Sequence, residues 1–230
     1  MYKHIIKRFL DIVLSAIAII VLAIPMVIIA LAIKIDDPGP VLFKQRRVGK
    51  KKNGEITYFM IWKFRSMKMC TPHDVPTHLL ENPEQYITRV GRFIRKTSLD
   101  ELPQIYQVFT SKLSVVGPRP ALWSQDDLVA EREKYGANDM KPGITGWAQI
   151  NGRDELEIDV KARFDGEYAE AINKGCFKGF LMDCKCFFGT IVSVLKSDGV
   201  VEGGTGELKK QQKEKKEDSL QDEKDTDHGC

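Results

Sequence analysis

Two neighbouring carboxylates, Asp100 and Glu101, lie in a stretch of sequence that is otherwise rich in cations. A carboxylate can act as a nucleophile toward phosphorus or as a hard oxygen ligand for Mg²⁺, and arginine can bind phosphate oxygens through two parallel hydrogen bonds. The combination indicates metal-assisted chemistry on an anionic substrate. A structural alternative exists, because acidic residues commonly begin helices. The nearby cations are Arg89, Arg92, Arg95, Lys96, Lys112 and Arg119.

The carboxylates fall near the start of a predicted helix, Leu99–Phe109. Its apolar residues recur at nearly helical spacing, and Pro103 fits a helix only in the first turn. Adjacent residues of a helix point about 100° apart. The two carboxylates can therefore share one site and have different roles.

A hydrophobic run over Ile12–Ile33, interrupted only by Ser15 and Pro25, is long enough to span a bilayer. Lysine and arginine flank it on both sides, and positive residues mark the cytoplasmic side of a membrane. A straight span would carry one positive flank across, whereas a helix broken at Pro25 could enter and leave by the same face. Both topologies, the straight anchor and the re-entrant helix, are open at this point.

The remaining segments predict a compact α+β fold that is mainly helical. The breaker residues at 36–40 end the apolar helix near Ile35. We expect strands at 41–43 and 56–62 around a turn at 49–54, loops at 70–83 and 141–147, and helices at 87–95, 122–135, 154–172 and 177–195. The helix at 122–135 reads as a polar surface helix. The last helix suits either the membrane interface or a buried core.

Three regions follow from these elements. Residues 1–35 form the membrane-embedded helix, residues 36–202 the cytosolic catalytic domain, and residues 203–230 a charged tail that cannot bury enough apolar surface to fold. The net charge is only +3, so local charge is the informative quantity. The five cysteines are an odd number and lack paired metal-ligand spacing, so we expect neither a disulfide framework nor a zinc site.

Three motifs together resemble one family, the bacterial sugar transferases, which are monotopic polyprenyl-phosphate phosphoglycosyl transferases. The first motif is Trp62-Lys63-Phe64-Arg65-Ser66-Met67. The second runs from Gly91 through Leu99-Asp100-Glu101-Leu102-Pro103-Gln104 to Gly117-Pro118-Arg119-Pro120. The third is 141–153, Lys-Pro-Gly-Ile-Thr-Gly-Trp-Ala-Gln-Ile-Asn-Gly-Arg. The resemblance covers roughly residues 1–200, with the motifs in the family's order and spacing.

The resemblance implies transfer of a sugar-1-phosphate from a nucleoside diphosphate sugar, most simply a UDP-sugar, to polyprenyl phosphate. In that family the first acid of the pair is the nucleophile and Mg²⁺ assists, with Mn²⁺ as a possible substitute. These roles fall on Asp100 and Glu101. The family's N-terminal helix is re-entrant and breaks at a proline, here Pro25. The implied location is the cytoplasmic face of the bacterial inner membrane, in surface-glycan synthesis.

Further site residues follow from the motifs. The cations can neutralise a diphosphate so that an anionic nucleophile can approach it, and prolines on both sides of Arg119 give it a stiff backbone. Trp147 can stack on a base or sugar, or simply fill the core. The predicted phosphate ligands are Lys63, Arg65, Arg95, Arg119 and Arg153, and the weaker pocket residues are Pro118, Pro120, Trp147, Gln149 and Asn151.

The chain departs from the family pattern at two places. Ile24 stands where many members have Ser before the proline, and Ser111-Lys112 replaces Gly-Asp. An inactive transferase homologue is therefore kept as one alternative. A membrane-tethered binding or regulatory protein, which would explain the cations, is kept as another. Nucleic-acid binding is not expected, because the aromatic residues are not interleaved with a basic face. The sequence leaves the sugar and the oligomeric state open.

Overall fold

The computed structural model describes residues 2–71, 83–152 and 156–195. This part of the chain is mainly helical with two small two-stranded sheets, in agreement with the expected α+β class. The predicted tail, most of the predicted loop at 70–83 and Arg153 lie outside the described residues. The helices are α1 (Lys7–Asp36), α2 (Arg89–Lys96), α3 (Gln104–Phe109), α4 (Asp126–Glu133), α5 (Trp147–Ile150), α6 (Ile158–Asn173) and α7 (Cys176–Leu195). The strands are β1 (Leu42–Val48), β2 (Tyr58–Phe64), β3 (Ser114–Val116) and β4 (Gly143–Thr145), and the short helical turns are η1 (Tyr2–Ile6), η3 (Pro83–Tyr86), η4 (Leu99–Glu101) and η5 (Ala137–Asp139).

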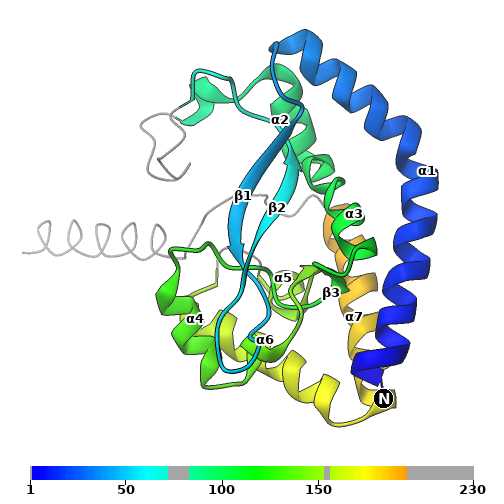
Figure 1. Ribbon diagram of the computed structural model, residues 1–230, viewed down its shortest axis with the longest axis vertical. Helices are drawn as coiled ribbons and strands as arrows, with labels where there is room; N and C mark the ends of the chain where they lie inside the picture. The colour runs from blue at the N-terminus through cyan, green and yellow to red at the C-terminus, as the bar shows by residue number, and fades with distance from the viewer. Residues whose placement is uncertain (1, 72–82, 153–155, 196–230) are drawn as a thin grey trace, which may run out of the picture.

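Helix α1 is the one described helix that is long and apolar enough to cross a membrane. It continues without interruption through Pro25, and its ribbon changes direction in its second half (Figure 1). It ends at Asp36, one residue beyond the predicted end. Much of its surface is exposed and apolar, including Ile20, Ile24 and Ile35.

The N-terminal end of α1 is fixed to the rest of the protein by polar contacts. The buried carboxylate of Asp11 accepts hydrogen bonds from the Ser114 hydroxyl at 2.9 and 3.0 Å and from the Val115 backbone N–H at 2.9 Å. The guanidinium of Arg8 donates to the carbonyls of Val108 and Phe109 at the end of α3, both at 2.7 Å. The first turns of α1 are therefore joined to both β3 and α3.

The C-terminal half of α1 packs on the same domain. Ile29 and Ile33 form a buried apolar cluster with Phe64 of β2 and Ile94 of α2. Asp36 at the end of α1 accepts a hydrogen bond from the backbone N–H of Val90 at 2.9 Å. Both ends of α1 thus contact one body, as Figure 1 shows.

The two sheets differ in kind. Strands β1 and β2 are antiparallel, with Lys44 opposite Trp62. Strand β1 is longer than the predicted strand at 41–43, whereas β2 has the predicted length and lies two residues beyond the predicted 56–62. Strands β3 and β4 are parallel. Strand β4 and the start of α5 occupy the segment 141–147, which the sequence predicts to be a loop. A turn-rich composition does not exclude a strand of three residues when a partner strand supplies its hydrogen bonds.

The predicted helix over Leu99–Phe109 is in fact two pieces, the η4 turn and α3. Pro103 has no backbone N–H to donate into a continuous helix, so a tight turn precedes it. The predicted helices at 154–172 and 177–195 are confirmed as α6 and α7. Helix α4 is shorter than predicted, and it buries Arg132 rather than presenting only a polar surface.

The C-terminal helices close a second core around the N-terminus. Tyr168 of α6 and Cys186 of α7 are buried with Tyr2. Asp183 of α7 accepts hydrogen bonds from the hydroxyls of Tyr2 at 2.5 Å and Tyr168 at 2.9 Å and pairs with Lys7 at 2.7 Å. Away from this core, α7 exposes large apolar residues, among them Phe177, Leu181 and Phe188.

Candidate active site

The carboxylates are presented by the η4 turn between α2 and α3. Ser98, directly before the turn, has a left-handed backbone with φ of 56°. Leu99 and Leu102 pack into the apolar cluster under α1, so the intervening acids are turned away from that cluster. The leucine-acid-acid-leucine order therefore fixes the direction in which Asp100 and Glu101 project.

Asp100 and Glu101 meet two of the predicted cations. The ammonium of Lys63 lies 3.0 Å from a Glu101 oxygen and 3.5 Å from an Asp100 oxygen. The guanidinium of Arg119 donates to the same Glu101 oxygen at 2.9 Å. Both carboxylates are largely enclosed, with side-chain exposures of 5% for Asp100 and 16% for Glu101. Lys63 and Arg119, which lie 56 positions apart in the sequence, are thus brought into one cluster.

The charges of this cluster favour an ionised Glu101. Burial alone would raise the pKa of the Glu101 carboxyl, but the adjacent Arg119 and Lys63 cations outweigh burial and hold that pKa well below its usual value. Glu101 therefore remains a carboxylate throughout the physiological pH range. An arrangement of two carboxylates with a lysine and an arginine can bind an anionic group and place a carboxylate against it.

Lys63 is positioned by its own strand and by α3. The buried side chain of Gln107 accepts a hydrogen bond from the Trp62 backbone N–H at 2.9 Å and donates to the Met60 carbonyl at 2.7 Å. Gln107 therefore joins α3 to β2 immediately beside Lys63. The same short helix that follows the carboxylates also fixes the strand that carries their lysine.

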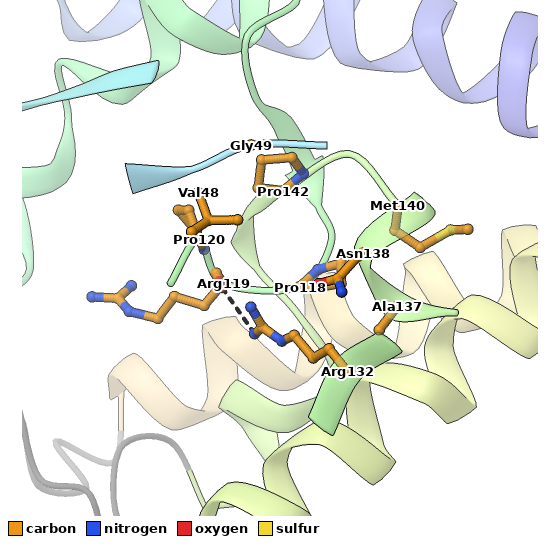
Figure 2. A pocket seen from close by; sticks show the side chains of 10 residues that line it. All are labelled: Val48, Gly49, Pro118, Arg119, Pro120, Arg132, Ala137, Asn138, Met140 and Pro142. Carbon is orange, nitrogen blue, oxygen red and sulfur yellow. Dashed lines mark hydrogen bonds between the residues drawn. The ribbon is translucent and has the colours of Figure 1, made fainter. Parts of the chain in front are cut away.

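Arg119 is carried by the loop that follows β3. Gly117 lies so close to the chain at 141–143 that an added Cβ would be 2.3 Å from the Lys141 carbonyl oxygen, which only glycine avoids. Pro118 and Pro120 flank Arg119, and their carbonyls accept hydrogen bonds from Gly143 and Arg47. The backbone of this loop lines a small pocket, and the Arg119 side chain points away from it (Figure 2).

Two predicted phosphate ligands have other partners in this structure. Arg65 forms an ion pair with the Asp37 carboxylate and also donates to the Asp37 carbonyl. Arg95 donates to the Ser66 hydroxyl at 2.8 Å. Arg65 would have to release Asp37 to bind a phosphate, whereas Lys63 and Arg119 already contact the carboxylates.

The weaker pocket residues on and around α5 mainly support the backbone. The Trp147 indole donates to Glu167 at 2.8 Å and packs against the core around Tyr168. Gln149 donates to the Ile144 carbonyl at 2.8 Å, and Asn151 donates to the Trp147 carbonyl at 2.7 Å. These contacts favour the packing interpretation of Trp147 over stacking on a ligand.

Asp100 and Glu101 are the carboxylates of this site that could hold a divalent metal ion. Within the described residues there is no group of three or more His, Cys, Asp or Glu side chains able to hold a metal ion. The donor chemistry of Asp100 and Glu101 nevertheless fits Mg²⁺, which is commonly bound by one or two carboxylates together with substrate phosphates.

Sequence reasoning missed three residues that support the site. Asp11, Arg132 and Asp165 are buried charged residues. Asp11 did carry a signal, because it is an acid at the very edge of the apolar run. Arg132 and Asp165 are separated by 33 positions on different helices, and no local pattern connects them.

Fold and site together define a protein with a membrane-length apolar helix and a cation-enclosed carboxylate pair suited to a phosphate-containing ligand. The chain belongs to the bacterial sugar transferase family, whose model matches residues 2–197. The motif-based resemblance is thereby confirmed.

Similar proteins carry names that agree with this family. The chain is 41% identical over 179 residues to the UDP-glucose:undecaprenyl-phosphate glucose-1-phosphate transferase of Escherichia coli, which covers 72% of this chain and 36% of that protein. It is 38% identical over 201 residues to the exopolysaccharide production protein PSS of Rhizobium leguminosarum bv. phaseoli, covering 83% and 96%. It is 34% identical over 209 residues to the undecaprenyl-phosphate galactose phosphotransferase of Salmonella typhimurium, covering 84% and 41%.

The relatives differ in length. The chain spans just over a third of the Escherichia coli protein but nearly all of the Rhizobium protein.

Proposed function

We propose that this chain transfers a sugar-1-phosphate from a UDP-sugar to undecaprenyl phosphate and releases UMP. The observation that carries the proposal is the buried Asp100 carboxylate next to Glu101, with Lys63 and Arg119 within ion-pair distance of the pair. The names of the glucose and galactose relatives support the substrate classes.

In the first step Asp100 is the nucleophile. A carboxylate oxygen of Asp100 attacks the sugar-bearing phosphorus of the donor, the bond from that phosphorus to the bridging oxygen breaks, and UMP leaves with the electron pair. Lys63 and Arg119 offset the negative charge that would otherwise repel the nucleophile. The product is an acyl phosphate in which Asp100 carries the phosphosugar.

In the second step a phosphate oxygen of undecaprenyl phosphate attacks the same phosphorus. The bond between that phosphorus and the Asp100 oxygen breaks, which regenerates the carboxylate and forms undecaprenyl diphosphate sugar. Two steps let a water-soluble donor and a lipid acceptor use one small site in turn.

Asp100 and Glu101 are the residues that would hold Mg²⁺, or Mn²⁺ in its place. A divalent ion bound there would supply further neutralisation of the donor diphosphate. Because Glu101 is ionised and already bound by two cations, its carboxylate is fixed in place before a ligand arrives.

We further propose that α1 is re-entrant and that the domain lies on the cytoplasmic face of the inner membrane. A helix of 30 residues is about 45 Å long, so a straight span would separate its ends by the whole bilayer. Asp11 near one end and Ile33 near the other both contact the same domain. The exposed apolar faces of α1 and α7 would then contact lipid.

The test is a donor half-reaction with purified protein in detergent or nanodiscs. UDP-glucose, UDP-galactose and UDP-N-acetylhexosamines are supplied one at a time without acceptor, and UMP release and protein mass are measured. We expect one UMP per active molecule and a phosphosugar adduct on the peptide containing Asp100. Asp100→Asn should abolish both, while Asp126→Asn, an exposed acid on α4, should not. An adduct on another residue, or nucleotide release by Asp100→Asn, would reject the assignment.

The same assay separates the alternative readings. A binding protein or an inactive homologue would release no UMP from any donor even though it is folded. Addition of undecaprenyl phosphate to the trapped adduct should discharge it into the lipid product. Omission of divalent cation, with a chelator present, should reduce the burst if the metal proposal is correct.

A further inference from the structure

We infer that Arg132 and Asp165 are positioning residues that set the location of Arg119, and this inference rests on the proposed function. Neither residue has a role in the motifs, and neither touches the carboxylate pair in the described contacts. They act through the backbone of Arg119, from the opposite side of the loop.

The contact to Arg119 is direct. The Arg132 guanidinium donates to the Arg119 carbonyl oxygen at 2.9 Å, which Figure 2 shows as a dashed line. From the same residue, the Arg119 side chain extends away from Arg132 and reaches Glu101. One residue is therefore held by its carbonyl on one side and by its guanidinium on the other.

Arg132 is itself held by a buried partner. Two of its nitrogens lie 2.6 and 2.8 Å from one Asp165 oxygen. The side-chain exposures are 5% for Arg132 and 1% for Asp165, so water does not compete for these bonds. A planar guanidinium can serve the carboxylate and the carbonyl at once, which an ammonium cannot do with the same geometry.

The arrangement matters because Arg119 has a long side chain. Small displacements at its backbone move the guanidinium relative to Glu101 and to any bound diphosphate, and misplacement of about 1 Å is costly in catalysis. Pro118 and Pro120 stiffen the loop, and their carbonyls accept hydrogen bonds from Gly143 and Arg47. The Arg119 carbonyl between them needs a contact of its own to fix its position. The pair joins α4 and α6 to the loop and supplies this contact.

A double-mutant cycle tests the inference. Arg132→Lys is compared with the wild type, and again in an Arg119→Ala background, by kcat and KM for the donor that the wild type uses. We expect about a tenfold loss of kcat/KM in the first background and less than about a twofold loss in the second, since the effect passes through Arg119. Glu133→Gln, also on α4 but in contact with Lys51 and Asn138 instead, is the matched control.

A second variant distinguishes a positioning effect from a loss of folded protein. Asp165→Asn keeps the shape and one acceptor oxygen, and it should give a smaller loss with the same dependence on Arg119. Rates are divided by the folded fraction, and thermal unfolding is recorded for each variant. Equal losses in both backgrounds would show a purely structural role and overturn the inference. Absence of UMP release from the wild type would instead reject the proposed function itself.

Discussion

Asp11, in the second turn of the apolar helix α1, accepts hydrogen bonds from the hydroxyl of Ser114 at the start of β3. Strand β3 leads within three residues to Pro118 and Arg119. The beginning of α1 is therefore bonded to the strand that leads into the Arg119 loop. Helix α1 is part of the framework of the site.

Asp11→Ala should destabilise the protein and reduce transfer. It leaves the buried Ser114 hydroxyl and Val115 N–H without their acceptor, which costs about 1–3 kcal/mol. Asp11→Asn keeps one acceptor oxygen and should lose less. Thermal unfolding in detergent and kcat/KM measure both effects. Equal stability of Asp11→Ala and wild type would show that the contact is dispensable.

Arg119→Lys should lower kcat/KM by about tenfold, equivalent to about 1.4 kcal/mol of transition-state stabilisation. Lysine keeps the positive charge near Glu101 but lacks the fork that binds two oxygens. Arg163→Lys, an exposed arginine on α6, is the control. Kinetics equal to those of the wild type would make Arg119 a structural arginine.

Glu101 should make stability depend on pH in the acid range. Its pKa in the folded protein lies well below the ordinary value of 4.5. Its stabilising contribution is therefore fully present above about pH 5 and is lost as the pH falls toward the folded pKa. The unfolding temperature of wild type minus that of Glu101→Gln should be constant from pH 8 to about 5 and should shrink below that. A difference that grows on acidification would contradict the ion-pair interpretation.

The topology of α1 should be re-entrant. In a background without native cysteines, single cysteines at Lys3 and Lys50 should both react with a membrane-impermeant reagent only from the cytoplasmic side. Lys174→Cys, at the exposed end of α6, is the cytoplasmic reference. Pro25→Ala restores a backbone donor and should shift part of the population toward a straight span. Labelling of position 3 from the periplasm in the unaltered helix would rule out re-entry.

Trp147→Phe should affect stability rather than donor binding. The indole N–H is bonded to Glu167 and the ring packs on the core, so loss of the bond should cost about 1 kcal/mol. The donor KM should remain unchanged. A several-fold increase in KM with normal stability would instead support stacking on the base or sugar.

The sequence by itself determined the local features of this protein. An apolar run with positive flanks defines α1, alternating and helical periodicities locate most elements, and the motifs identify Asp100, Glu101, Lys63 and Arg119. Each of these features depends on residue type and short-range spacing, which the sequence shows directly.

Only the tertiary structure decided which distant groups meet. Arg65 and Lys63 stand in one motif, yet Arg65 pairs with Asp37 while Lys63 reaches the carboxylates. Arg132 lies in a segment that reads as a polar surface helix, yet it is buried against Asp165. The physical reason is that burying a charge is favourable only beside a specific partner, and that partner is brought close by the packing of elements far apart in the chain.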